Sequence, residues 1–155
     1  MTVKNMSTPM SAAEGGANSS AATPDRGQFL RRVLQGNAAF STLSGMLFVL
    51  DSQPVANFLG FTNPAAATYV LWLGISLLGW ALFAYWVSTR PTLSRTAVFS
   101  VLAGDLLWVA GSIILLIRGW LPFSTAGYWA VAIVADMVAL FAILQFVGWR
   151  RSSKG

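Results

Sequence analysis

The sequence contains no cysteine and no histidine among its 155 residues. Without cysteine the chain can form no disulfide and offers no thiol nucleophile or thiolate metal ligand. Without histidine it lacks the commonest metal ligand and the usual general base at neutral pH. Its glycines follow no phosphate-loop pattern. We therefore expect a protein that is not an enzyme and that carries no metal and no cofactor.

Charged residues are also scarce. They make up 10% of the chain, against about 25% in a typical soluble domain. Asp51 and Arg90 are separated by 38 residues without a single charge. A soluble fold of this size cannot bury such a run, whereas a bilayer can. The net charge of +5 comes from basic residues at the ends of apolar segments and forms no basic face, so we expect no binding to nucleic acid.

Four apolar segments are each close to the ~20 residues that a helix needs to cross the hydrocarbon core. The sequence predicts an all-α membrane protein with four transmembrane helices in an up-down bundle. The bundle occupies residues 29–151, and its helices span about 29–50, 69–87, 96–117 and 127–148.

Residues outside these segments have other expected roles. Residues 1–28 are rich in small and polar side chains without apolar periodicity, which predicts a disordered cytoplasmic tail. Residues 152–155 form a short cytoplasmic tail. In the first loop, Pro54 and the Asn63–Pro64 pair are expected to break helices, and residues 55–61 between them are apolar enough to lie on the membrane surface.

The basic residues are distributed unequally between the two sides of the predicted membrane. Arg118 alone falls on one side, and the other side holds Lys4, Arg26, Arg31, Arg32, Arg90, Arg95, Arg150, Arg151 and Lys154. Positive residues favour the cytoplasmic side. We therefore expect a multi-pass protein of the cell (inner) membrane with both termini in the cytoplasm. Trp86 and Trp149 near the cytoplasmic side and Trp120 near the other fit two aromatic belts.

The two halves of the chain resemble each other at a shift of 59 residues. Phe40, Ser41, Leu43, Gly45 and Leu47 then fall on Phe99, Ser100, Leu102, Gly104 and Leu106, and Gly60, Ala67 and Tyr69 fall on Gly119, Ala126 and Tyr128. The shift predicts two duplicated helical hairpins in parallel orientation, related by an axis along the membrane normal. The alternative is two unrelated hairpins that draw on one limited set of residues.

Two acids interrupt the predicted membrane segments, Asp105 in the third and Asp136 in the fourth. Counting ~1.5 Å per residue places them about 13 Å and about 18 Å from the cytoplasmic boundary, so we expect them to face inward and approach each other. The candidate proton, cation or ligand site is Asp105, Asp136, Trp108, Trp80 and Ser112. The alternative is a structural role, with the acid bonded to the Trp108 indole, a serine hydroxyl or backbone to hold helices together.

The first membrane segment carries a polar stripe that we interpret mainly as a packing surface. Small and hydroxyl-bearing side chains let membrane helices approach closely. The stripe consists of Asn37, Ser41, Ser44 and Gly45. Gln145, near the cytoplasmic end of the fourth segment, is expected to make a packing hydrogen bond.

Two functions remain open on the sequence. The first is an accessory or structural subunit that packs in the lipid bilayer against other membrane proteins or against itself. The second is a small proton- or cation-coupled transporter or ligand-binding bundle that uses Asp105 and Asp136. The helix count of the chain resembles that of small drug and cation exporters, which use an acid early in the first helix. This chain has no acid there, so no residues are carried over.

Overall fold

A computed structural model describes residues 25–152, and within them it forms five helices and no strand. These are α1 (Asp25–Leu50), α2 (Ser52–Leu59), α3 (Pro64–Thr89), α4 (Arg95–Arg118) and α5 (Thr125–Ser152). All except α2 are long and apolar enough to cross a membrane. The all-α, four-span bundle is therefore confirmed. Most of the expected disordered tail, residues 1–24, and residues 153–155 lie outside the described range.

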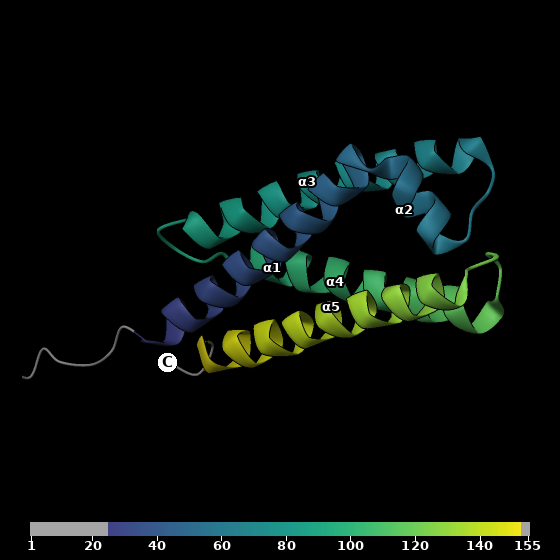
Figure 1. The fold of residues 1–155 in the computed structure, drawn as a ribbon. Coiled ribbons are helices and arrows are strands. Elements are labelled where there is room, and N and C mark those ends of the chain that lie inside the picture. Colours follow the sequence, from purple (N-terminus) through teal and green to yellow (C-terminus); the bar gives the residue numbers. More distant parts are fainter. Residues whose placement is uncertain (1–24, 153–155) are drawn as a thin grey trace, which may run out of the picture.

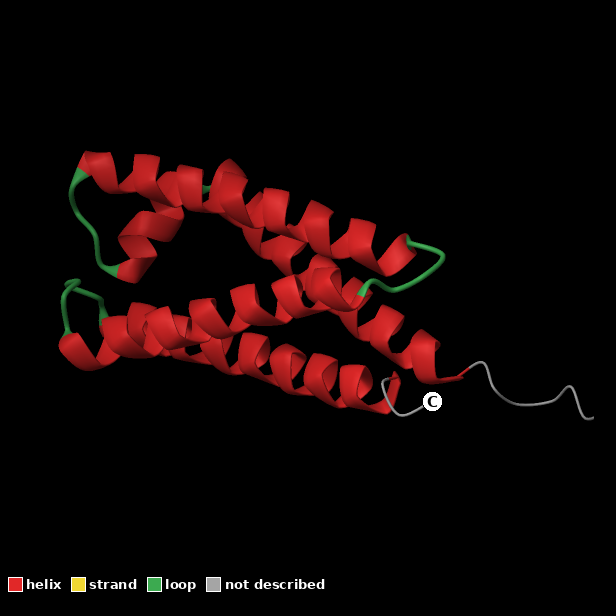
Figure 2. Ribbon diagram, turned by 180° about the vertical axis from the view of Figure 1, so that it is seen from behind, coloured by secondary structure: helices red, strands yellow, loops and turns green. Residues whose placement is uncertain are grey.

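The four spans run up and down as two hairpins, α1 with α3 and α4 with α5 (Figure 1). The start of α1 and the end of α5 lie at the same end of the bundle. We call this the basic end, because Arg31, Arg90, Arg95 and Arg150 lie there; the other is the opposite end. The hairpins are joined mainly by α1 against α5, whereas α3 and α4, although consecutive in the chain, contact each other little. Seen from behind, the two hairpins form separate layers (Figure 2).

The helices begin earlier or end later than the sequence predicts, and α3 shows why. The Asn63–Pro64 pair was expected to break a helix, yet α3 begins at Pro64. The Asn63 side chain accepts a hydrogen bond from the Ala65 backbone N–H at 2.9 Å, as an N-cap residue does. Proline is well suited to the first helical position, where its missing N–H is not needed. The pair therefore starts the helix, five residues before the expected Tyr69. Likewise, α1 begins at Asp25, inside the expected tail.

The short helix α2 closes the opposite end of the bundle. It covers residues 52–59, close to the expected surface-lying stretch, and Gly60 ends it with a left-handed φ of 106°. The α4–α5 loop is hydrogen-bonded to the end of α2. The Ser124 N–H donates to the Leu59 carbonyl at 2.8 Å, and the Ser124 hydroxyl donates to the Phe58 carbonyl at 2.6 Å. These bonds tie the first hairpin to the second at the end where the spans pack less.

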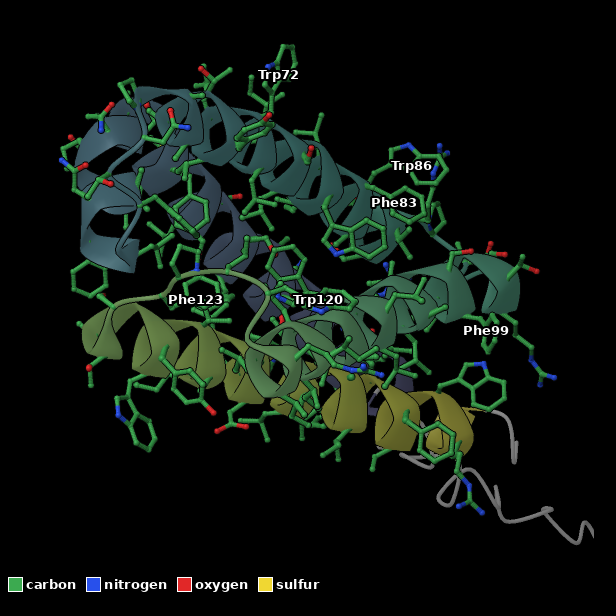
Figure 3. The ribbon with its side chains drawn as sticks, turned by 90° about the vertical axis from the view of Figure 1, so that its right-hand side faces the viewer. Trp72, Phe83, Trp86, Phe99, Trp120 and Phe123 are labelled. Atoms are coloured by element: carbon green, nitrogen blue, oxygen red, sulfur yellow. The ribbon has the colours of Figure 1, made fainter. Side chains whose placement is uncertain are left out.

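The main apolar core lies toward the basic end and contains residues from α1, α3 and α4. Its buried members are Leu30, Leu34, Ala38, Ala84, Val87, Val98 and Val101. At the same end, Arg31 links α1 to the end of α3 and the loop that follows it. Its guanidinium donates to the Ser88 carbonyl at 2.6 Å and to the Pro91 carbonyl at 2.8 Å. Trp86 projects from α3 nearby (Figure 3), with the Arg90 guanidinium 3.9 Å from its ring centre. Trp120 is exposed in the α4–α5 loop at the opposite end, so these two tryptophans lie near the two ends.

Two glycines set the close approach of α1 and α3. A Cβ on Gly45 would lie 3.0 Å from the Gly74 carbonyl oxygen, and a Cβ on Gly74 would lie 2.9 Å from the Gly45 carbonyl oxygen. Gly45 was expected in a packing stripe, and the structure places it there. The duplication itself stays a prediction. We note that its aligned glycines, Gly60 and Gly119, both have positive φ and both end a helix.

Candidate functional site

A buried polar cluster surrounds Asp105. Its Oδ2 accepts hydrogen bonds from the Asn37 amide and the Gln145 amide, each at 2.7 Å. Its Oδ1 accepts a hydrogen bond from the Trp80 indole N–H at 3.1 Å. Asp105 is 2% exposed, Asn37 1% and Gln145 0%. We call these four residues the Asp105 cluster.

Each of the four spans contributes one member to the Asp105 cluster. Asn37 comes from α1, Trp80 from α3, Asp105 from α4 and Gln145 from α5. Counted from the basic end of its own helix, each member lies about seven to twelve residues in, or roughly 10–18 Å at 1.5 Å per residue. The cluster thus forms one polar layer that crosses the whole bundle in its basic half.

Gly104 makes room for the indole that reaches Asp105. An ideal Cβ on Gly104 would overlap the six-membered ring of Trp80. Because position 104 has no side chain, the Trp80 ring occupies the space beside it and the indole N–H reaches the neighbouring carboxyl of Asp105. Because α3 and α4 otherwise contact each other little, this contact is a main link between them.

The electrostatics of the Asp105 cluster are unusual for a membrane interior. All three partners of Asp105 are neutral donors, so they satisfy a carboxylate without neutralising its charge. An acid at the centre of a membrane helix costs about 2.5–3.5 kcal/mol on insertion scales, and hydrogen bonds from neutral donors offset part of that cost. The Gln145 Oε1 is buried beside the carboxyl and has no hydrogen-bond partner among the described residues. A buried acceptor without a donor is itself unfavourable.

Asp136 does not join Asp105, contrary to expectation. The residue of α5 that meets Asp105 is Gln145. Asp136 lies nine residues away on the same helix, which is two and a half turns and about 14 Å. Two and a half turns place it on the opposite side of α5, and its side chain is exposed. The expected inward orientation is therefore wrong, because α5 buries Ala135, Val138, Ala142 and Gln145 instead.

The remaining expected site residues are divided between the core and its edge. Ser112 is buried on the same side of α4 as Asp105, and Trp108 is partly buried. The indole that binds Asp105 belongs to Trp80, not to Trp108. In the polar stripe of α1, Asn37, Ser41 and Gly45 are buried and Ser44 is half-buried.

Asn37 and Gln145 were expected to serve helix packing, and the sequence did not indicate them as partners of the acid. Their depth was a usable signal. Counting from the basic end places both amides near the level of Asp105, and an acid in a membrane interior needs polar partners at its own depth. Distance along the helices alone did not show which residue of α5 turns toward the acid.

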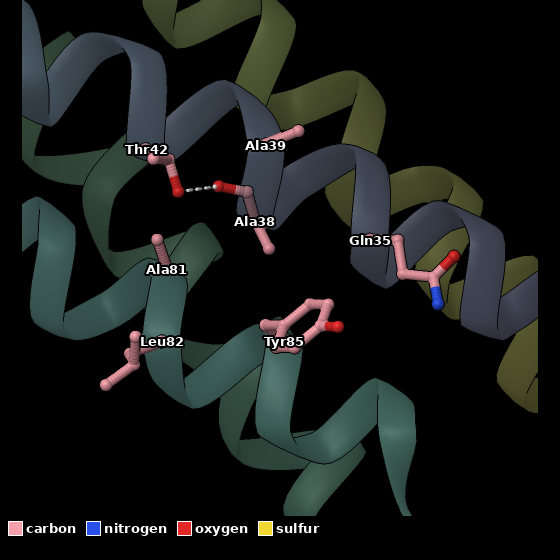
Figure 4. A pocket seen from close by; sticks show the side chains of 7 residues that line it. All are labelled: Gln35, Ala38, Ala39, Thr42, Ala81, Leu82 and Tyr85. Atoms are coloured by element: carbon pink, nitrogen blue, oxygen red, sulfur yellow. Dashed lines mark hydrogen bonds between the residues drawn. The ribbon is translucent and has the colours of Figure 1, made fainter.

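A shallow groove of about 590 Å³ lies between α1 and α3 (Figure 4). Its lining is mainly alanine and leucine, with polar groups from Gln35, Thr42 and Tyr85. The Thr42 hydroxyl is occupied by the Ala38 carbonyl of its own helix at 2.8 Å. No member of the Asp105 cluster lines this groove, so it does not lead to the buried acid.

The chain matches no protein-family model, no curated protein and no solved structure. The four apolar spans remain the basis for its class, and they make it a small multi-pass integral membrane protein.

Proposed function

We propose that this small integral membrane protein is a non-catalytic accessory subunit whose bundle packs against other membrane proteins in the cell (inner) membrane. The observation that supports this role is the hydrogen bonding of Asp105. Its two oxygens accept three bonds, one from each of the other spans. An acid used in this way holds four helices in register, which is a structural use of a polar residue in a membrane.

The burial of the Asp105 cluster supports the same interpretation. A transport site must let its acid exchange partners with water or cargo, whereas the Asp105 and Gln145 side chains are 2% and 0% exposed. Reaching the carboxyl would require at least one of the four spans to move. A fixed cross-link at this position suits a protein whose task is to present a rigid outer surface.

One observation favours the alternative, a proton- or cation-coupled transporter. The unpartnered Gln145 Oε1 lies next to the Asp105 carboxyl. Carboxylate and amide oxygens are both ligands of hard cations, and either could also accept a proton in a relay. This alternative uses Asp105 alone, because Asp136 lies on the other side of α5.

The variant Asp105→Asn separates the two functions. The asparagine amide has two donors and one acceptor, so it can stay fully bonded if the amides of Asn37 and Gln145 both turn over. The variant therefore keeps the fold and removes the charge. In proteoliposomes that contain a pH-sensitive dye or, in a parallel experiment, a sodium-sensitive dye, an accessory subunit shows no proton or sodium flux with either residue at position 105.

The complementary measurement is partner recovery. A tagged wild-type chain extracted in mild detergent should co-purify with other membrane proteins in fixed proportion, and Asp105→Asn should recover the same set. Asp51→Asn, at an exposed loop position, is the matched control. Flux that Asp105→Asn abolishes, together with no co-purifying protein, would overturn the accessory role and establish the transporter.

A further inference from the structure

Asp136 lies near the middle of α5, 11 residues after Thr125 and 16 before Ser152. It is exposed, and within residues 25–152 no hydrogen bond or ion pair reaches it. Its exposed neighbours are Ile133, Met137, Leu140 and Ile143. On an isolated bundle the carboxyl would therefore face lipid tails near the centre of the bilayer.

Such a position is unfavourable, and membrane proteins avoid it. Acids inside membrane segments almost always face protein or water and pair with another polar group. No residue of the described bundle pairs with Asp136, and the polar layer around Asp105 lies about 14 Å away along α5. A partner from another molecule would satisfy the carboxyl.

Depth and chemistry together identify a second copy as that partner. Two copies inserted in the same direction are related by an axis along the membrane normal, so every residue has the same depth as its counterpart. A neutral carboxyl carries one donor and one acceptor, and two carboxyls can each donate to the other. The Asp136 carboxyl can therefore pair with the Asp136 carboxyl of a second copy, which lies at the same depth in the membrane.

The residues one turn to either side of Asp136 permit the close approach that such a pair needs. Ala132 precedes it by four residues and Ala139 follows it by three, so both lie on the same side of α5. Small residues at these positions let two helix backbones approach closely. The larger Trp129 and Ile143 lie one turn further out, are both exposed, and would pack around the pair.

We propose that the chain forms a two-fold symmetric dimer through α5, with the two Asp136 carboxyls hydrogen-bonded to each other across the axis. The dimer goes beyond the accessory role, because it forms with or without another membrane protein. It also gives the exposed acid a function separate from that of Asp105, which holds the spans within one copy.

Disulfide cross-linking tests the surface directly, because the chain has no cysteine of its own. In liposomes, Ala139→Cys should form a disulfide-linked dimer on mild oxidation. Leu107→Cys, at a 74% exposed position of α4, is the control and should form no disulfide between copies, because α4 lies outside the proposed interface. Equal cross-linking from both positions, or none from Ala139→Cys, would overturn the proposal.

A second measurement tests the acid itself. Energy transfer between copies labelled at Thr92→Cys, diluted with lipid, gives the dimer dissociation constant. Asp136→Asn should dimerise like the wild type, since an amide also pairs with itself, whereas Asp136→Leu should dimerise about tenfold more weakly. Because position 136 is exposed, leucine there leaves the bundle folded.

Two further results would count against the dimer. The first is an Asp136→Leu variant that associates as well as the wild type. The second is a purified wild type that stays monomeric and needs Asp136 only to recover a different membrane protein. The second result would overturn the dimer and leave the accessory role standing. If no partner is recovered but the dimer is intact, the accessory role would be overturned and the dimer would stand.

Discussion

Gly104 and Trp80 fit together as backbone and ring: the indole occupies the space that a side chain at position 104 would fill. The fit places the Trp80 N–H 3.1 Å from Asp105 Oδ1. It also explains how α3 and α4, which otherwise contact each other little, are held at the level of the Asp105 cluster.

Gly104→Ala should destabilise the bundle. The added methyl displaces the Trp80 ring and its hydrogen bond, and overpacking of this kind costs about 1–3 kcal/mol. Reversible unfolding in mixed micelles measures the change. Gly111→Ala on the same helix is the matched control, since a Cβ there meets nothing within 4 Å, and it should be neutral or stabilising by up to about 1 kcal/mol. If Trp80→Phe does not reduce the cost of Gly104→Ala, the clash is not its cause.

The stability of variants at position 105 should depend on how many hydrogen bonds the new side chain keeps, and not on its charge. Asp105→Leu leaves three buried donors without an acceptor, at about 0.6–1.7 kcal/mol for each bond in a membrane. We expect it to lower the free energy of unfolding by about 2–5 kcal/mol. Asp105→Asn should stay within about 1 kcal/mol of the wild type, because turning over two amides restores all three bonds. Equal losses in the two variants would contradict this account.

Arg31→Lys should weaken the basic end while keeping its charge. The guanidinium bonds two carbonyls at once, Ser88 and Pro91, and an ammonium group does not reproduce that fork. We expect a loss of about 1–2 kcal/mol in the same unfolding experiment. Arg32→Lys, at the adjacent exposed position, is the control and should change little. Similar losses at both positions would show that the two Arg31 hydrogen bonds add no stability beyond that of an exposed arginine.

The orientation in the membrane can be measured with single cysteines at Thr92, in the α3–α4 loop, and Leu121, in the α4–α5 loop. The excess of arginine on the α3–α4 side predicts that it faces the cytoplasm. A membrane-impermeant maleimide added to intact cells should label Leu121→Cys, and should label Thr92→Cys only after the membrane is opened. The reverse pattern would invert the topology.

Much of the fold follows from the order of residues along the chain. Four long apolar runs, each with at most one charged residue, specify four spans, since only a bilayer accommodates them, and the structure confirms this. Helix ends were less predictable. The Asn63–Pro64 pair can either stop a helix or start one, and the choice depends on what the following residues pack against.

The number of spans, their up-down order and the presence of two acids in apolar surroundings can all be predicted from the amino-acid sequence. Which of the two acids is buried depends on how the helices pack in three dimensions. Because acids in membrane helices generally face inward, we expected the Asp136 side of α5 to face the other helices. In the structure the Gln145 side faces them instead. Residues nine apart lie on opposite sides of a helix, so the two cannot both face the same neighbour. The rotation of a membrane helix is set by contacts with the other spans. Those contacts bury Asp105 among three donors and leave Asp136 for a second molecule.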